Sequence, residues 1–159
     1  AMEVPQTGGD TLFCNMYMAY ETLPENLRAR LQGLTAVHNI MSGAGADAKV
    51  TLTDAQRAKV PDAIHPIVRR HPETGREALF VNPGFTRRIE GMDAAEGAAL
   101  LQELYRHATE ERFTHRHKWR PGDLTLFDGR ASMHSATGGY ISAQPRTLWR
   151  AFMGGSYAK

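Results

Sequence analysis

The chain has 159 residues, of which 42% are hydrophobic and 23% charged, and its formal net charge is +2. This length and apolar content favour one domain with a buried core, and so mild a charge, on scattered basic residues, excludes a dedicated nucleic-acid-binding surface. The single cysteine excludes an internal disulfide and a cysteine metal knuckle, and the chain shows no apolar run of eighteen residues and no basic-then-apolar leader, so we expect a cytoplasmic protein.

The first third of the chain reads as short strands and short helices. We expect, in order, the end of a strand at 1–5, a turn at 6–10, a strand at 11–16, helices at 17–23 and 24–32, and a strand at 34–40. Two glycines in the first turn supply the positive φ angles that other residues resist, and Gly33 is a typical C-terminal cap.

The middle of the chain begins with a run of small residues at 41–49, which we expect to be a mobile loop, and a short helix at 54–59. A strand at 63–71, a turn at 72–75 and a partner strand at 77–82 then predict a hairpin. Next comes the clearest helix of the sequence, at 93–108. Asp93 and Glu96 form an aspartate version of the capping box at its start. Its predicted buried stripe is Ala94, Ala98, Leu101, Leu104, Tyr105 and Ala108.

A strand at 113–119 carries His115 and His117 on one face, because strand side chains alternate with a period of two. Such a pair could hold a metal, although no third ligand lies near it in the sequence, and two structural histidines are the alternative. A turn at 121–123 and a strand at 124–127 follow.

The stretch 127–150 sets one histidine and two arginines along what we expect to be two neighbouring strands. Arg146, Leu148 and Arg150 share a strand face, so two guanidiniums point the same way. Like charges on one face are unfavourable unless an anion lies between or beyond them, which predicts an anion site beside His134, a candidate metal ligand. A hydrogen-bonded structural histidine and a solvated edge strand remain the alternative interpretation.

Seven or eight short strands, closely spaced turns and one long helix favour a double-sheet jelly-roll over a parallel α/β fold, because strands and helices do not alternate regularly. We therefore predict a mainly β fold with flanking helices.

Three stretches resemble the TauD/TfdA family of iron(II)- and 2-oxoglutarate-dependent dioxygenases. Residues 127–130, Phe-Asp-Gly-Arg, followed by His134 and then by Arg146 and Arg150, are similar to the family's W-D-N-R-x-x-x-H run and its R-x-x-x-R pair. Gly-Gly-Asp-Thr at 8–11 and the run from His65 to Ile89 resemble the family as well. The resemblance covers nearly the whole chain, to Gly155.

The resemblance implies a double-stranded β-helix (jelly-roll), incomplete at the N-terminus, with residues 1–159 as one domain that forms the C-terminal portion of the catalytic domain. It implies Fe(II), 2-oxoglutarate and O₂ as cofactor and cosubstrates, and hydroxylation of a small, anionic organic substrate with release of succinate and CO₂. The loop at 41–49 would correspond to a variable loop that covers the substrate.

The resemblance also assigns roles to individual residues. His134 would be an iron ligand, and Thr11 with Arg146 would hold the far carboxylate of 2-oxoglutarate. Arg150 would bind an anionic group of the substrate, and Phe85 would form one wall of the substrate pocket. The alternatives are a plain hairpin turn at Thr11 and an ordinary core aromatic at Phe85.

Three departures from the family pattern bear on these roles. The family's His-x-Asp pair, two of its three iron ligands, lies upstream of the Gly-Gly-Asp-Thr turn, and these residues contain no His-x-Asp, so we expect the chain alone to bind iron weakly and to be inactive. Gly129 stands where the family usually has asparagine and should loosen the turn before His134. An extended loop at 137–140 makes the positions of the two arginines uncertain.

Three classes of function stay open from the sequence: the dioxygenase, a non-catalytic carboxylate-binding jelly-roll module or truncated relative without the His-x-Asp ligands, and a structural subunit. The partner expected in the first case is a small anionic molecule, with neither nucleic acid nor membrane, and a homo-oligomer stays open. The substrate itself is not readable, because similar scaffolds of the family serve several classes of anion.

Overall fold

The computed structural model describes residues 1–39, 53, 61–141 and 143–152. The predicted mobile loop at 41–49 and the predicted helix at 54–59 lie outside these described residues. Within them, strands and a few helices make up the fold, so the prediction of a mainly β protein with flanking helices is confirmed at this level.

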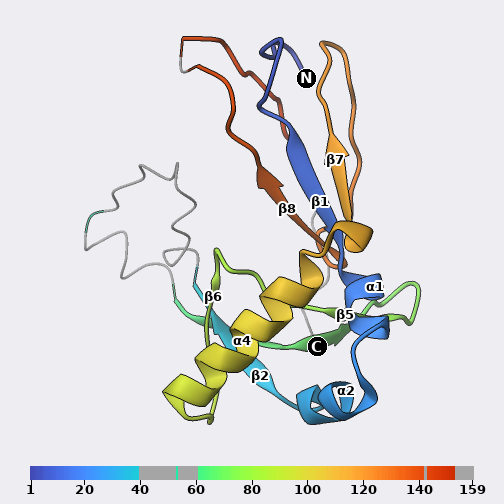
Figure 1. The fold of residues 1–159 in the computed structure, drawn as a ribbon, viewed down its shortest axis with the longest axis vertical. Coiled ribbons are helices and arrows are strands. Elements are labelled where there is room, and N and C mark those ends of the chain that lie inside the picture. The colour runs from blue at the N-terminus through green and yellow to red at the C-terminus, as the bar shows by residue number, and fades with distance from the viewer. Residues whose placement is uncertain (40–52, 54–60, 142, 153–159) are drawn as a thin grey trace.

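The described strands form three antiparallel sheets, shown in Figure 1. The first sheet contains, in spatial order, β7 (Thr114–His117), β1 (Thr11–Asn15) and β8 (Ser132–Ala136). The second contains β3 (Ala63–Pro66), β2 (Thr35–His38) and β6 (Thr86–Ile89). The third is the hairpin of β4 (Val68–Arg70) and β5 (Glu77–Leu79).

The described helices lie beside the second and third sheets. They are α1 (Met16–Glu21), α2 (Glu25–Leu31), α4 (Ala94–Ala108) and the 3₁₀ turn η2 (Glu111–Phe113). Helix α4 packs against β6, and α1 packs against β5. We call these helices, with strands β2 to β6, the helical layer; β7, β1, β8 and the segments 124–127 and 146–152 are the β1 sheet region, which extends away from the helical layer in Figure 1.

The core lies in the helical layer. Its largest fully buried side chains are Met16, Leu31, Val37, Ile67, Leu79, Ile89, Leu100 and Leu104. Asp93 caps α4 as predicted, because its carboxylate accepts hydrogen bonds from the backbone N–H groups of Ala95 and Glu96. The predicted stripe of α4 is partly wrong: Ala94 and Ala98 are exposed, and Gly97 and Leu100 are buried instead.

The single strand predicted at 63–71 is divided between two sheets. Residues 63–66 pair with β2 and residues 68–70 pair with β5, so only the second half belongs to the predicted hairpin. The division falls at Ile67, whose N–H donates to Leu34 while its carbonyl accepts from Phe80. Pro66, which has no N–H for a ladder, stands directly before it.

Two further strand predictions are wrong within the described residues. Residues 124–127 pair with no strand there, and residues 146–150 contribute a single bridge, between Thr147 and Glu3. Both segments belong to the β1 sheet region, where few described neighbours offer a partner for the backbone. In addition, no helix among the described residues is both long and apolar enough to cross a membrane.

Candidate active site

His134 lies near the middle of β8, opposite Phe13 of β1. Its ring stacks on Phe13 at a centroid distance of 5.9 Å and meets Phe127 at 4.7 Å, although the residue as a whole is exposed. Loss of solvent around the ring, and then the positive charge of Arg150, hold the pKa of His134 below its ordinary value. The imidazole is therefore neutral near pH 7, which is the form that binds metals.

Thr11, at the start of β1, is buried and accepts hydrogen bonds from two side chains. The indole N–H of Trp119 donates to its hydroxyl oxygen at 2.9 Å, and Nη2 of Arg146 does so at 3.4 Å. A hydroxyl group has two acceptor lone pairs and one proton. With the lone pairs engaged by two donors, the Thr11 proton is left to donate to an acceptor such as a carboxylate.

Arg146 is held beside Thr11 by the backbone of the glycine turn. Its Nε donates to the carbonyl oxygen of Gly9 at 2.8 Å. Gly9 has a φ of +66°, and a Cβ there would lie 3.1 Å from Cδ of Arg146 and 3.0 Å from the Pro5 ring. Glycine is therefore needed at this position both for its backbone conformation and for the close approach of the guanidinium.

The loop at 137–140 packs directly on the glycine turn. The N–H of Gly9 donates to Gly138, and the N–H of Thr137 donates to Asp10. A Cβ on Gly8 would lie only 2.3 Å from the carbonyl oxygen of Gly139, so two glycines meet at this contact. The extended loop, which made the arginine positions uncertain from the sequence, thus braces the turn that holds Arg146.

Arg150 is exposed, lies over the ring of Phe152 at 4.4 Å, and is close enough to His134 to lower its pKa. The two arginines therefore do serve different neighbours, one at Thr11 and one near His134. They do so without the regular strand face that the sequence predicted, since residues 146–150 form only one bridge.

A pocket of about 190 Å³ lies beside β8. Its wall joins His134 and Phe85, which the sequence analysis placed in the metal and substrate sites, and Phe85 is 43% exposed rather than a core residue. His38 of β2 and Arg130 line the same pocket. The rest of the wall consists of Met16, Leu79, Phe80, Val81, Asn82, Gly129, Ser132 and Met133.

His38 was not predicted to be a pocket residue. Its Nδ1 lies 3.3 Å from the hydroxyl of Thr86, and its ring meets His65 and Phe80 edge-on or tilted at 5.3 and 5.6 Å. Burial, and next the charge of His65, lower the pKa of His38 to about 4. This ring is neutral at physiological pH.

The His115 and His117 pair does not assemble a metal site within the described residues, which contain no cluster of three His, Cys, Asp or Glu side chains suited to a metal. Both line a groove of about 440 Å³ beside β7, and His117 lies 3.3 Å from the carboxylate of Asp123. The sequence analysis also passed over one His-x-Glu pattern, His71-Pro72-Glu73. His71 is bonded to Asp128 at 3.0 Å through Nε2, and its Nδ1 lies 3.2 Å from the carboxylate of Glu73.

Trp119 and His71 were missed because their partners lie far away in the sequence, although His71 stood inside the family-like run 65–89. Trp119 reaches Thr11 across 108 positions, and His71 reaches Asp128 across 57. Asp128 and Arg130, by contrast, stood inside the quoted family motif, but no role was given to either side chain.

Comparison with known proteins gives consistent matches. The model of the "Taurine catabolism dioxygenase TauD, TfdA family" matches residues 1–152. The chain is 40% identical over 151 residues to the alpha-ketoglutarate-dependent 2,4-dichlorophenoxyacetate dioxygenase of Cupriavidus pinatubonensis, covering 95% of this chain and 52% of that protein. It is 35% identical over 163 residues to the (S)-phenoxypropionate/alpha-ketoglutarate-dioxygenase of Sphingobium herbicidovorans, covering 98% of this chain and 55% of that protein.

A solved structure, that of AAD-2 in complex with Mn(II) and N-oxalylglycine, matches with a TM-score of 0.83 and 33% identity over 92% of this chain and 57% of that one. A taurine dioxygenase from Burkholderia xenovorans matches with a TM-score of 0.71 and 39% identity, over 86% of this chain and 44% of that one. The chain thus spans about half the length of the relatives that it matches.

Proposed function

Because the chain belongs to the TauD/TfdA family of dioxygenases, we propose that it forms the 2-oxoglutarate-binding part of an Fe(II)- and 2-oxoglutarate-dependent dioxygenase. The complete protein would hydroxylate a small anionic organic molecule in the cytoplasm, with release of succinate and CO₂. Residues 1–159 would be one domain, the C-terminal portion of the family's jelly-roll. Enzymes of this family use Fe(II), 2-oxoglutarate and O₂.

The observation that carries this proposal is the arrangement of Arg146, Thr11 and Trp119. An arginine held by a backbone carbonyl, beside a hydroxyl whose lone pairs already accept two N–H groups, presents a positive charge and a free hydroxyl proton together. A carboxylate accepts both, and a charged partner makes these hydrogen bonds stronger than neutral ones. Thr11 and Arg146 would thereby orient the far carboxylate of 2-oxoglutarate.

Of the three protein ligands that such an iron site uses, the described residues supply one candidate, His134. A neutral, exposed imidazole at His134 suits a metal, but the described residues offer no three-membered ligand cluster. We propose that the other two protein ligands come from outside the described residues, in keeping with relatives that are about twice as long. Fe(II), when bound, supplies the O₂ chemistry that is coupled to decarboxylation of the cosubstrate.

The substrate would lie in the pocket that His134 and Phe85 share. Its wall is mostly apolar and aromatic, Arg130 contributes a guanidinium to it, and Arg150 lies close enough to His134 to lower its pKa. An anion with an apolar body fits this combination, and the names of two relatives, for phenoxyacetates and phenoxypropionates, describe such molecules. Arg150 would bind the anionic group and Phe85 would contact the apolar body.

A second candidate function is a carboxylate-binding module without catalysis. The observation that favours it is the absence of a complete metal cluster in the part of the chain that the structure describes. In that case the 2-oxoglutarate carboxylate would still bind at Arg146, and metal would not affect its affinity.

The test of the proposed function is His134→Ala in the complete protein. We expect iron binding and turnover to be lost together, because a facial triad without one of its histidines holds the metal through two ligands. Metal content after dialysis and 2-oxoglutarate decarboxylation measure the two effects. The matched control is His115→Ala, on the opposite edge of the same sheet, which should keep both.

Near wild-type turnover in His134→Ala would end the dioxygenase assignment. A second measurement, calorimetric titration of the 159-residue chain with Fe(II), should show weak binding at best. A single tight site on this chain would contradict the proposal that two of the iron ligands lie outside the described residues. It would direct attention to His115 and His117.

A further inference from the structure

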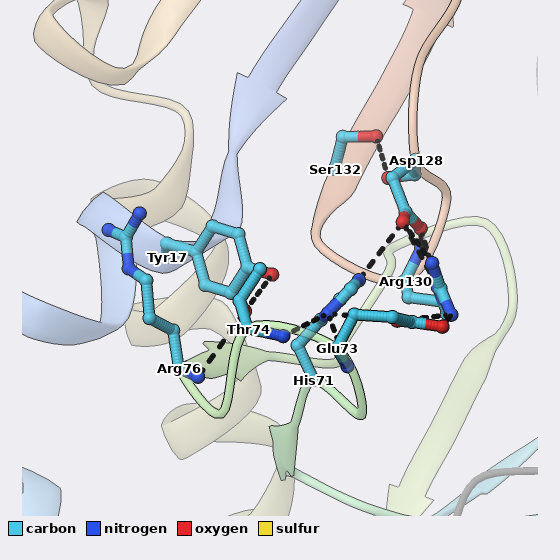
Figure 2. Close-up of polar contacts among 8 residues, drawn as sticks. All are labelled: Tyr17, His71, Glu73, Thr74, Arg76, Asp128, Arg130 and Ser132. Atoms are coloured by element: carbon cyan, nitrogen blue, oxygen red, sulfur yellow. Dashed lines mark hydrogen bonds and ion pairs between the residues drawn. The ribbon is translucent and has the colours of Figure 1, made fainter.

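A cluster of four charged or polar side chains lies at the turn that leads into β8. It consists of His71, Glu73, Asp128 and Arg130, and we call it the His71–Asp128 clamp (Figure 2). Nε2 of His71 is 3.0 Å from Oδ2 of Asp128, and Nε of Arg130 donates to both oxygens of the same carboxylate at 2.9 and 3.0 Å. Arg130 also bonds Glu73 through Nη1 at 2.9 Å. The clamp thus joins the β4–β5 turn to the 128–130 turn.

The orientation of the His71 ring is defined by its surroundings. Its Nδ1 accepts the backbone N–H groups of Glu73 and Thr74, both at 3.3 Å. Nδ1 also lies 3.2 Å from Oε2 of Glu73, while Nε2 makes the hydrogen bond with Asp128, so each ring nitrogen faces a carboxylate of the clamp. His71 is only 6% exposed, so this hydrogen bond satisfies a buried polar atom that would otherwise lie unpaired.

The other side of the same turn is held by α1. Arg76 donates through Nε and Nη2 to one carboxylate oxygen of Glu21, at 3.0 and 2.8 Å, and lies over the ring of Tyr17 at 4.3 Å. The Tyr17 hydroxyl is 3.0 Å from the hydroxyl of Thr74 (Figure 2). These contacts hold the turn at 71–76 against helix α1, and the same turn contacts Asp128 through His71.

Asp128 connects the clamp to the start of β8 through hydrogen bonds. Its side chain accepts the backbone N–H of Arg130 at 2.8 Å, and its carbonyl oxygen accepts the N–H of Ala131 and the hydroxyl of Ser132. Ser132 is the first residue of β8, two positions before His134. Gly129 was expected to loosen this turn. The side chains of Asp128 and Arg130, on either side of it, are hydrogen-bonded and hold the turn instead.

We propose that His71, Asp128 and Arg130 are positioning residues that fix the start of β8 and so the place of the His134 imidazole, an inference that rests on the proposed function of His134 as a metal ligand. Arg130 also lines the pocket that His134 shares with Phe85. The clamp thus ties the ligand strand and the pocket wall to the helical layer, which holds the buried core, and groups that orient a metal ligand are worth about tenfold or more in metal affinity.

The experiment compares both sides of one turn in the complete protein. His71→Ala and Asp128→Asn break the clamp, whereas Glu21→Gln breaks the ion pair of the same turn with α1 and leaves the clamp intact. Mn(II) affinity is measured by titration, and the exchange rates of the β8 backbone amides are measured without metal. Thermal unfolding of each variant reports any general loss of stability.

We expect the two clamp variants to weaken Mn(II) binding by tenfold or more and to speed exchange of the β8 amides, and His71→Gln, which keeps a donor for Asp128, to restore part of both. Glu21→Gln should leave both within twofold of the wild type. The proposal is overturned if the clamp variants leave β8 exchange unchanged, or if Glu21→Gln alters exchange and affinity as much as they do. If the wild type binds no Mn(II), the function proposed for His134 fails, and β8 exchange still decides whether the clamp holds the strand.

Discussion

The largest buried side chains lie in the helical layer, whereas the most exposed large apolar side chains lie near the C-terminal end of the described residues. The eight largest fully buried side chains all come from the helical layer. Among the described residues, the large hydrophobic ones that are more than 60% exposed all lie between residues 124 and 152; they are Leu124, Leu126, Ile141, Trp149 and Phe152. Yet Thr11, His134, Arg146 and Arg150 all belong to the β1 sheet region. The largest buried side chains and the residues proposed for metal and 2-oxoglutarate binding therefore lie in different parts of the molecule, which meet at the pocket shared by His134 and Phe85.

The largest effect that would test this comparison is on stability. Leu104→Ala, at a fully buried position of α4, should lower the free energy of unfolding by about 2–5 kcal/mol, because the lost contacts leave a cavity. Leu124→Ala, at a position that is 89% exposed, should change it by about 0.5 kcal/mol or less. Urea denaturation of the 159-residue chain measures both. Equal losses would mean that the two regions are packed alike in solution.

A second test separates the two arginines of the β1 sheet region. Arg146→Ala should raise the KM for 2-oxoglutarate by the equivalent of about 2–4 kcal/mol, because a charge-assisted contact is lost. Lysine at this position should rescue it only in part, since an ammonium group cannot reproduce the fork of donors. The assay is 2-oxoglutarate decarboxylation by the complete protein.

Arg150→Ala is the matched variant, and we expect it to weaken the organic substrate while leaving the KM for 2-oxoglutarate nearly unchanged. The structure gives the two guanidiniums different neighbours, Gly9 and Thr11 for Arg146 and the surroundings of His134 for Arg150. An equal loss of 2-oxoglutarate affinity in both variants would show that Arg146 and Arg150 bind the carboxylate of 2-oxoglutarate together.

The smallest effect concerns His38, on the pocket wall where the helical layer meets β8. Its pKa is lowered to about 4 in the folded chain, against an ordinary value of 6.5. Between these values the unfolded chain binds a proton that the folded chain does not, so the free energy of unfolding falls as the pH drops from 6.5 to 4. The slope from one histidine cannot exceed about 1.4 kcal/mol per pH unit, because at most one bound proton distinguishes the unfolded from the folded state.

The control for this pH effect is His38→Gln, which keeps a polar side chain and removes the titration. Urea denaturation at pH 6.5, 5.5 and 4.5 should give a shallower decline in this variant than in the wild type. His65, on the adjoining strand β3, and Arg69, whose charge lowers the pKa of His65, stay unchanged in the comparison. Identical slopes would show that His38 titrates normally in the folded protein.

The sequence by itself predicted the elements whose signals lie within a few residues. The cap at Asp93 and the periodicity behind it gave α4, the glycine turn gave the entry to β1, and Pro72 to Gly75 gave the β4–β5 turn. The resemblance of three stretches to family motifs indicated the family and selected His134 and Arg146 as candidate site residues. The predictions of the cap, the helix and the two turns were confirmed because capping, turn geometry and side-chain periodicity act locally, before any tertiary contact forms.

Tertiary structure alone decided the contacts that give the candidate site its shape. The Trp119 hydrogen bond to Thr11 spans 108 positions, the His71 bond to Asp128 spans 57, and the division of residues 63–71 at Ile67 follows from two different partner strands. The failure of residues 146–150 to form a strand has the same origin, since a strand exists only where a neighbour satisfies its backbone. Local chemistry fixes which residues could serve a site, and packing across the chain fixes which of them meet.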